Sequence, residues 1–155
     1  MSLQPAPNPR MKHRIVSKPA FQVVGIAQRT SNARPAEIGA LFRRFHAENT
    51  LAKIEDKLDD TAIALYADYE SDHTGPFTMV LGAIVRRADR VPSGMVARTV
   101  PAQRYAVVEA RGAMPAALIA TWSAVWASDL PRSFGVDFDL FSGPEAADVH
   151  VALRG

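Results

Sequence analysis

The order strand–helix–strand–strand occurs twice along this chain of 155 residues, and the repeat limits the folds that the chain can adopt. In the first copy, residues 20–29 are rich in β-branched and aromatic side chains and predict a strand. Apolar side chains at helical spacing predict a helix over residues 35–48. The segments 61–69 and 77–87 predict two strands joined by a turn at residues 70–76.

The second copy repeats this order without repeating the residues, so the duplication is one of pattern. It predicts a strand at 103–110, a helix from Pro115 that ends before Pro131, and strands at 136–141 and 149–153. One copy alone would have one helix on three strands and too small a core. Two copies side by side predict an α+β fold, in which duplicated βαββ units form an antiparallel sheet with helices on one face and a ligand groove on the other.

The composition excludes several classes of function. The formal net charge is only +2 and the basic residues are scattered, which argues against direct binding of nucleic acid. There is no cysteine, the four histidines lack metal-ligand spacing, and no phosphate-binding or dinucleotide motif is present, so we expect neither a metal nor a cofactor. No apolar run reaches the ~20 residues that span a bilayer, so we expect a cytoplasmic protein without membrane contact.

The first residues differ in composition from the rest. Residues 1–12 contain three prolines and almost nothing to bury, so we expect a disordered tail or residues added for expression. A single folded domain is expected over residues 13–155.

Residues 136–141 form the strand with the strongest functional signal. Alternation gives this strand an apolar face, expected to pack under the helices, that consists of Val136, Phe138 and Leu140. The other face is expected to point into the groove and consists of Asp137, Asp139 and Phe141. The alternative is a half-exposed strand whose aspartates are simply solvated.

A carboxylate in a deep groove is costly unless a cation or hydrogen-bond donors meet it, and aromatic rings attract the same cation. Further candidates for ligand contact are the aromatic and acidic side chains Tyr66, Tyr69, Tyr105, Glu109 and Trp122. For Trp122, core packing at helical spacing with Trp126 competes with ligand contact, and for Glu109 the alternative is a solvated sheet edge.

An ordered set of short segments carries a family resemblance from about residue 14 onward. The segments are Lys18–Ile26 with Arg29-Thr30, Tyr66–Asp72 with Gly75-Pro76-Phe77, Pro92-Ser93-Gly94, Tyr105–Val108, Trp122, and Asp137-Phe138-Asp139 with Phe141. In these segments the chain resembles the GyrI-like small-molecule-binding domains, which are the effector-binding domains of AraC-type and MerR-type regulators. The short tail leaves no room for a helix-turn-helix reader, so the chain resembles a stand-alone member.

The resemblance implies a duplicated βαββ fold whose central groove takes lipophilic, often cationic, drugs and dyes. In the family an Asp-Phe-Glu-x-Tyr-like strand supplies an acidic residue to the groove. Asp139 takes the glutamate position and Phe141 the tyrosine position, so the carboxylate is one methylene shorter and the ring lacks a hydroxyl.

Three functions follow as hypotheses. The first is binding or sequestration of a small lipophilic compound, which could be linked to transcriptional regulation. The second is hydrolysis of an electrophilic toxin, with a groove carboxylate such as Asp139 or Glu109 as general acid or base and a tyrosine positioning the substrate. The third is a module that contacts a protein partner such as DNA gyrase.

Overall fold

The computed structural model describes residues 11–155, so the predicted tail lies outside the described residues except for its last two positions. Its elements are β1 (Arg14–Lys18), β2 (Phe21–Thr30), α1 (Pro35–Ala47), α2 (Thr50–Lys53), β3 (Lys57–Ala67), β4 (Phe77–Val85), β5 (Val96–Val100), β6 (Gln103–Arg111), α3 (Ala116–Trp126), β7 (Asp137–Gly143) and β8 (Ala146–Ala152). The predicted order of strand, helix, strand, strand is confirmed in both halves. The α+β class and the antiparallel sheet with helices on one face are confirmed as well.

Each half also begins with a short strand: β1 was not predicted, whereas β5 matches the extended segment that the sequence predicts at residues 95–100. In both halves the short strand is separated from the next by the dipeptide Pro-Ala, at Pro19-Ala20 and at Pro101-Ala102. A proline cannot donate to a sheet ladder, so it ends one strand and allows the chain to enter another. Strand β3 starts at Lys57, four residues before the predicted start. The prediction missed this first part because it is polar, and an irregularity between Lys57 and Ala62 separates it from the regular ladder with β4.

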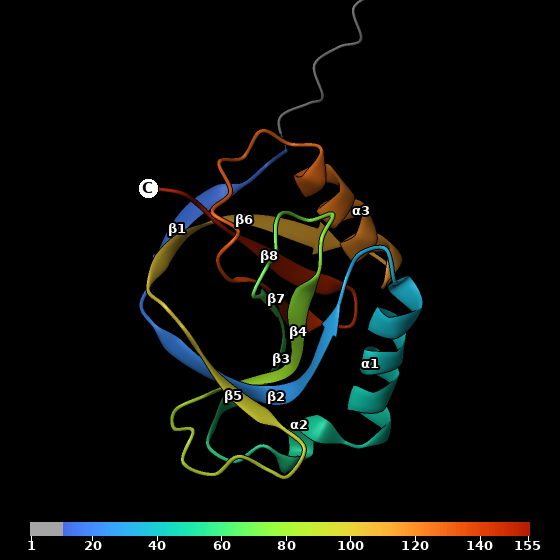
Figure 1. Ribbon diagram of the computed structural model, residues 1–155, viewed down its shortest axis with the longest axis vertical. Helices are drawn as coiled ribbons and strands as arrows, with labels where there is room; N and C mark the ends of the chain where they lie inside the picture. Colours follow the sequence, from blue (N-terminus) through green and yellow to red (C-terminus); the bar gives the residue numbers. More distant parts are fainter. Residues whose placement is uncertain (1–10) are drawn as a thin grey trace, which may run out of the picture.

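The eight strands form one antiparallel sheet in the order β1-β6-β8-β7-β3-β4-β2-β5. The order is symmetric about the central pair, since β7 and β3 occupy equivalent places in the two halves. The short strands are exchanged between the halves: β1 pairs with β6, and β5 pairs with β2. Figure 1 shows that the sheet curls into an open ring, with α1 and α3 outside it.

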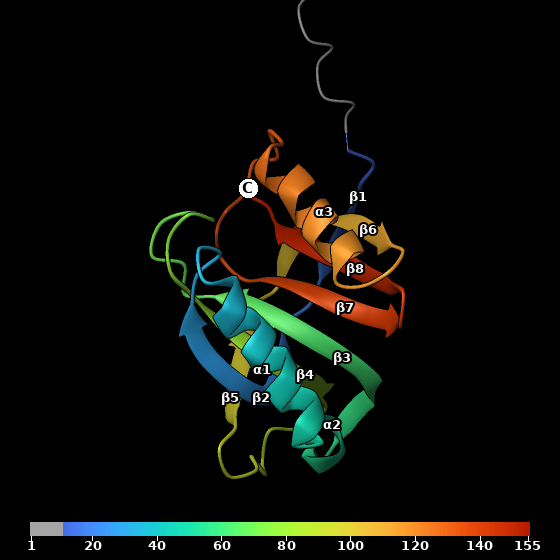
Figure 2. The same cartoon turned by 90° about the vertical axis from the view of Figure 1, so that its right-hand side faces the viewer.

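The curl gives the sheet an inner face and a helix face. The inner face is filled by an apolar core that includes Tyr105 and Phe138, both fully buried, with ring centroids 5.0 Å apart. On the helix face, α3 packs on β6 and β8, and α1 packs on β2 and β4. Figure 2 shows the two helices on the same side, with β3 and β7 passing between them. No helix within residues 11–155 is long and apolar enough to cross a membrane.

Candidate functional site

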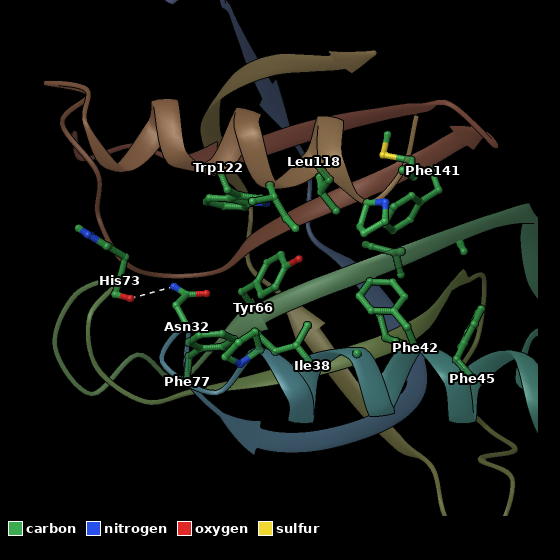
Figure 3. A pocket seen from close by; sticks show the side chains of 18 of the residues that line it. Asn32, Ile38, Phe42, Phe45, Tyr66, His73, Phe77, Leu118, Trp122 and Phe141 are labelled. Atoms are coloured by element: carbon green, nitrogen blue, oxygen red, sulfur yellow. Dashed lines mark hydrogen bonds between the residues drawn. The ribbon is translucent and has the colours of Figure 1, made fainter. Parts of the chain in front are cut away.

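A cavity of about 830 Å³ lies between α1 and α3, above the β3–β7 pair. Figure 3 shows apolar and aromatic side chains surrounding it from both helices and from the sheet. Its main lining residues are Ile38, Phe42, Phe45, Tyr66, Tyr69, Phe77, Leu118, Ile119, Trp122, Trp126, Arg132 and Phe141. Such a volume with a mainly apolar wall is typical of sites for drug-sized molecules.

The cavity lies on the helix face, so the prediction of a groove on the opposite face is wrong. The face without helices is covered by the curled sheet itself, which fills it with side chains. For the same reason the predicted orientation of residues 136–141 is reversed. Phe138 and Leu140 pack in the inner core, whereas the side chains of Asp137 and Asp139 contact residues of the helix face. The alternation itself is correct, since Asp137 and Asp139 do share a face, but both the face expected to meet the helices and the face expected to form the groove were wrong.

Asp139 lies in the central strand pair of the sheet, on β7 opposite Ala64 of β3. Its side chain is completely buried. Tyr66 donates its hydroxyl hydrogen to Oδ2 at 2.6 Å, and the indole Nε1 of Trp122 donates to Oδ1 at 3.1 Å. The two rings that line the cavity therefore cover the carboxylate, which lies directly behind them.

Burial raises the pKa of Asp139 to about 7, although the hydrogen bonds from Tyr66 and Trp122 favour the ionised form. The nearby carboxylate of Asp137 raises this pKa further. Asp139 thus changes charge near neutral pH, and a cation entering the cavity would favour its ionised form.

Asp137 is also completely buried, but it has a charged partner. Arg132 Nη2 donates to its Oδ2 at 2.9 Å, the Tyr69 hydroxyl donates to the same oxygen at 2.7 Å, and the backbone amide of Ala152 donates to Oδ1 at 2.7 Å. Burial raises the pKa of Asp137, and the positive charge of Arg132 opposes that effect. Asp137 therefore anchors Arg132, Tyr69 and β8 to one another.

The two tyrosines of the site act as hydrogen-bond donors. Burial and the adjacent carboxylates raise the pKa values of Tyr66 and Tyr69 well above their ordinary value, so both phenols keep their protons at neutral pH. The Tyr66 ring packs edge-on against Trp122 and Phe77, with centroids 5.3 and 5.7 Å away. These contacts fix the aromatic floor of the cavity.

The structure brings six of the eight candidate residues together. Tyr66, Tyr69, Trp122 and Phe141 line the cavity, and Asp137 and Asp139 lie behind them, bonded to three of these four side chains.

Tyr105 and Glu109 lie outside the cavity. Tyr105 is packed in the inner core, and burial raises its pKa to about 12. Glu109 is exposed at the end of β6 and forms ion pairs with Arg14 at 3.4 Å and Arg111 at 3.6 Å. Both were placed in the groove because the inner face of the sheet was expected to be open.

Sequence reasoning missed the wall formed by α1 and one end of the cavity. Phe42 on α1 was identified only as an apolar helix position, and its ring packs edge-on against Phe141 at 6.1 Å. At the end, the Asn32 side chain donates to the His73 carbonyl at 2.8 Å, and the His73 ring stacks on Trp126 at 5.4 Å. The spacing of apolar residues on α1 was the available signal, but it cannot distinguish a core from a cavity wall.

Comparisons with known proteins identify the family of the chain. A family model described as "Cass2: Integron-associated effector binding protein" matches residues 14–144. "Putative transcriptional regulator protein YobU" of Bacillus subtilis is 30% identical over 139 residues, which cover 82% of this chain and 87% of that protein.

Two solved structures have the same fold. The integron cassette protein VCH_CASS2 from the mobile metagenome of Vibrio cholerae superposes with a TM-score of 0.77 at 28% identity, covering 92% of this chain and 95% of that one. SAV2435, whose structure was solved bound to tetraphenylphosphonium, superposes with a TM-score of 0.77 at 19% identity, covering 94% and 95%. With the family match over most of its length, the chain belongs to the Cass2 family of integron-associated effector-binding proteins, within the GyrI-like group.

Proposed function

We propose that this protein binds a lipophilic aromatic cation in the cavity between α1 and α3. The observation that carries the proposal is the buried carboxylate of Asp139 directly behind an aromatic wall. The negative charge attracts a cation, and the faces of Tyr66 and Trp122 add to that attraction. Because the wall of the cavity is mainly apolar, a lipophilic ligand would remove few polar protein groups from water when it binds.

The comparisons support the same ligand class. SAV2435, which has the same fold, binds tetraphenylphosphonium, a cation whose charge is surrounded by four aromatic rings. YobU is named as a regulator, so a compound bound here would act as an effector or would be sequestered.

Tetraphenylphosphonium can test the proposal directly, because Trp122 and Trp126 line the cavity and their fluorescence reports binding. We expect saturable binding by the wild-type chain and an affinity at least tenfold lower for Asp139→Asn, which keeps the shape and removes the charge. Asp148→Asn is the matched control, since Asp148 pairs with Arg111 outside the cavity. Wild type and Asp139→Asn should bind neutral triphenylphosphine oxide with about equal affinity, because that compound has no charge for the carboxylate to attract.

The pH dependence gives a second readout of the same charge. Because the pKa of Asp139 is raised to about 7, we expect affinity for the cation to increase as pH rises through 7 and to be flat in Asp139→Asn. Equal affinity of wild type and Asp139→Asn at pH 8 would show that the carboxylate does not contribute to binding.

Hydrolysis of an electrophilic compound remains a second candidate, favoured by the same raised pKa. A carboxyl group that titrates near neutral pH is suited to general acid or base catalysis. Turnover of an electrophilic ligand that is lost in Asp139→Asn while binding persists would support catalysis, and binding without product would exclude it for that ligand.

A further inference from the structure

Arg132 is a buried cation with unused hydrogen-bonding capacity. Its side chain is 6% exposed, and it donates to Asp137 through Nη2. Within residues 11–155, its Nε and Nη1 atoms are buried and have no hydrogen-bond partner. Leaving a buried donor unpaired costs about 1–3 kcal/mol, and more for a charged group, so an acceptor at this position would be strongly favoured.

The side chain stands where two cavities meet. Arg132 lines the cavity between the helices and also a smaller cavity of about 510 Å³, and His73 and Trp126 are shared in the same way. The smaller cavity adds hydrogen-bond donors and positive charge from Ser133 and Arg154, together with the acidic side chain of Asp72. The oxygen Oδ1 of Asp72 already accepts hydrogen bonds from the backbone and the side chain of Thr74.

Aromatic rings hold the guanidinium in place. Its central carbon lies 4.3 Å from the centroid of Phe134, 5.8 Å from that of Trp122 and 5.9 Å from that of Tyr69. A guanidinium that stacks flat on a ring uses its face for the contact and leaves its N–H edges for acceptors in the plane. Phe134 makes its contact with a φ of 55°, a conformation that bulky residues rarely adopt.

The geometry of β7 sets the spacing of the two buried carboxylates of the site. Asp137, which holds Arg132, and Asp139 lie two residues apart on one face of β7, or ~7 Å along the strand. Trp122 contacts both groups, through a cation–π contact with Arg132 and a hydrogen bond to Asp139, so a ligand beside Trp122 could place a cation near Asp139 and an acidic group near Arg132.

We propose that the natural ligand is amphoteric: an aromatic compound with a cationic group for Asp139 and a carboxylate that accepts hydrogen bonds from Arg132. The inference rests on the proposed function and specifies its ligand class. Charges then alternate in sign from Asp139 through the ligand to Arg132 and Asp137. A guanidinium suits a carboxylate because both groups are planar and their hydrogen bonds are charge-assisted.

Rhodamine B and its ethyl ester form a matched pair of probes. Both have the same cationic aromatic body, and only the free acid has a carboxylate. We expect the wild-type chain to bind the acid about tenfold more tightly than the ester, as measured by fluorescence anisotropy, because a hydrogen bond between two charged groups is stronger than one between neutral groups. The visible absorbance of the dye, which its closed lactone form lacks, verifies that the zwitterion is the bound species.

Two variants assign the preference to Arg132. Arg132→Met removes the donors, and the double variant Arg132→Met/Asp137→Asn also removes the charge that would otherwise be left buried without a partner. Circular dichroism identifies the variants that fold. In either folded variant the acid-to-ester preference should fall to about one, whereas the exposed control Arg87→Met should retain it.

The outcomes separate the two proposals. Equal affinity for acid and ester in the wild type would overturn the amphoteric ligand and leave the cation site standing. A preference that persists in the double variant, or that is lost in Arg87→Met, would overturn the role of Arg132. If neither dye binds although tetraphenylphosphonium does, the amphoteric ligand is overturned and the cation site stands; if none of the three compounds binds, both proposals fail.

Discussion

The inner face and the helix face of the same sheet differ in how their buried side chains pack. The inner face is filled, with Phe138 packed against Tyr105 and Phe21. The helix face keeps a cavity of about 830 Å³ between two helices and buries polar groups beside it. Strand β7 contributes to both faces, so adjacent residues on one strand belong to the stabilising core and to the proposed binding site.

The faces also differ in the groups that titrate. His150 lies on the inner side, stacked on Phe138 at 4.2 Å, and burial lowers its pKa to about 4. Asp139 lies on the helix side, where burial raises its pKa to about 7. Each group avoids its charged form, but one is an acid and the other a base, so the two faces respond to pH in opposite directions.

The largest expected effect is on the free energy of unfolding, which should depend more on the inner face than on the helix face. Phe138→Ala should lower the free energy of unfolding by about 3–5 kcal/mol and leave the affinity of the folded protein for tetraphenylphosphonium unchanged. Phe141→Ala, on a half-buried ring that lines the cavity, should cost at most about 2 kcal/mol and lower that affinity. Urea unfolding and fluorescence titration measure the two quantities, and the comparison breaks if Phe138→Ala weakens binding as much as Phe141→Ala.

The pH response of stability is the next largest effect. The unfolded chain loses the proton of Asp139 near pH 3.8 and the folded chain near pH 7, so stability from this group falls as pH rises between them. His150 is protonated near pH 6.5 when unfolded and near pH 4 when folded, so its contribution is lost as pH falls. The two effects partly cancel in the wild type.

Single variants should uncover each effect. Between about pH 4 and pH 6.5 the stability of Asp139→Asn should rise with pH, whereas that of His150→Gln should fall, each by a few kcal/mol, since a pKa change of one unit corresponds to about 1.4 kcal/mol. Urea unfolding at several pH values measures both slopes. Parallel slopes in the two variants would show that the faces do not titrate in opposite directions.

The smallest effects concern the two candidate residues outside the cavity. Tyr105→Phe removes the hydrogen bond that Gln103 donates to the phenol at 2.7 Å and should cost about 1 kcal/mol of stability. Glu109→Gln weakens exposed ion pairs and should change stability by less than about 0.5 kcal/mol. Neither should alter affinity for tetraphenylphosphonium, and a clear loss of affinity in either would bring the inner face back into the binding site.

Local patterns predicted most of the elements, though not β1, and they predicted the grouping of Asp137, Asp139 and Phe141, because period-two alternation follows directly from the backbone of a strand. They did not predict which face the helices cover, since that depends on the curl of eight strands and the exchange of β1 and β5. Arg132 was missed for a related reason. It lies between α3 and β7, and only the tertiary fold brings it to Asp137 and the surrounding rings.

The exchange of β1 and β5 limits how the protein can admit a ligand. A hinge motion that separates the two halves would break the central β3–β7 pair, and it would also break the β1–β6 and β5–β2 pairs. A ligand is therefore expected to enter with the sheet intact, at the rim of the cavity between α1 and α3, where the stacked rings of His73 and Trp126 form one end. A molecule too wide for that rim would be rejected even where the interior could hold it.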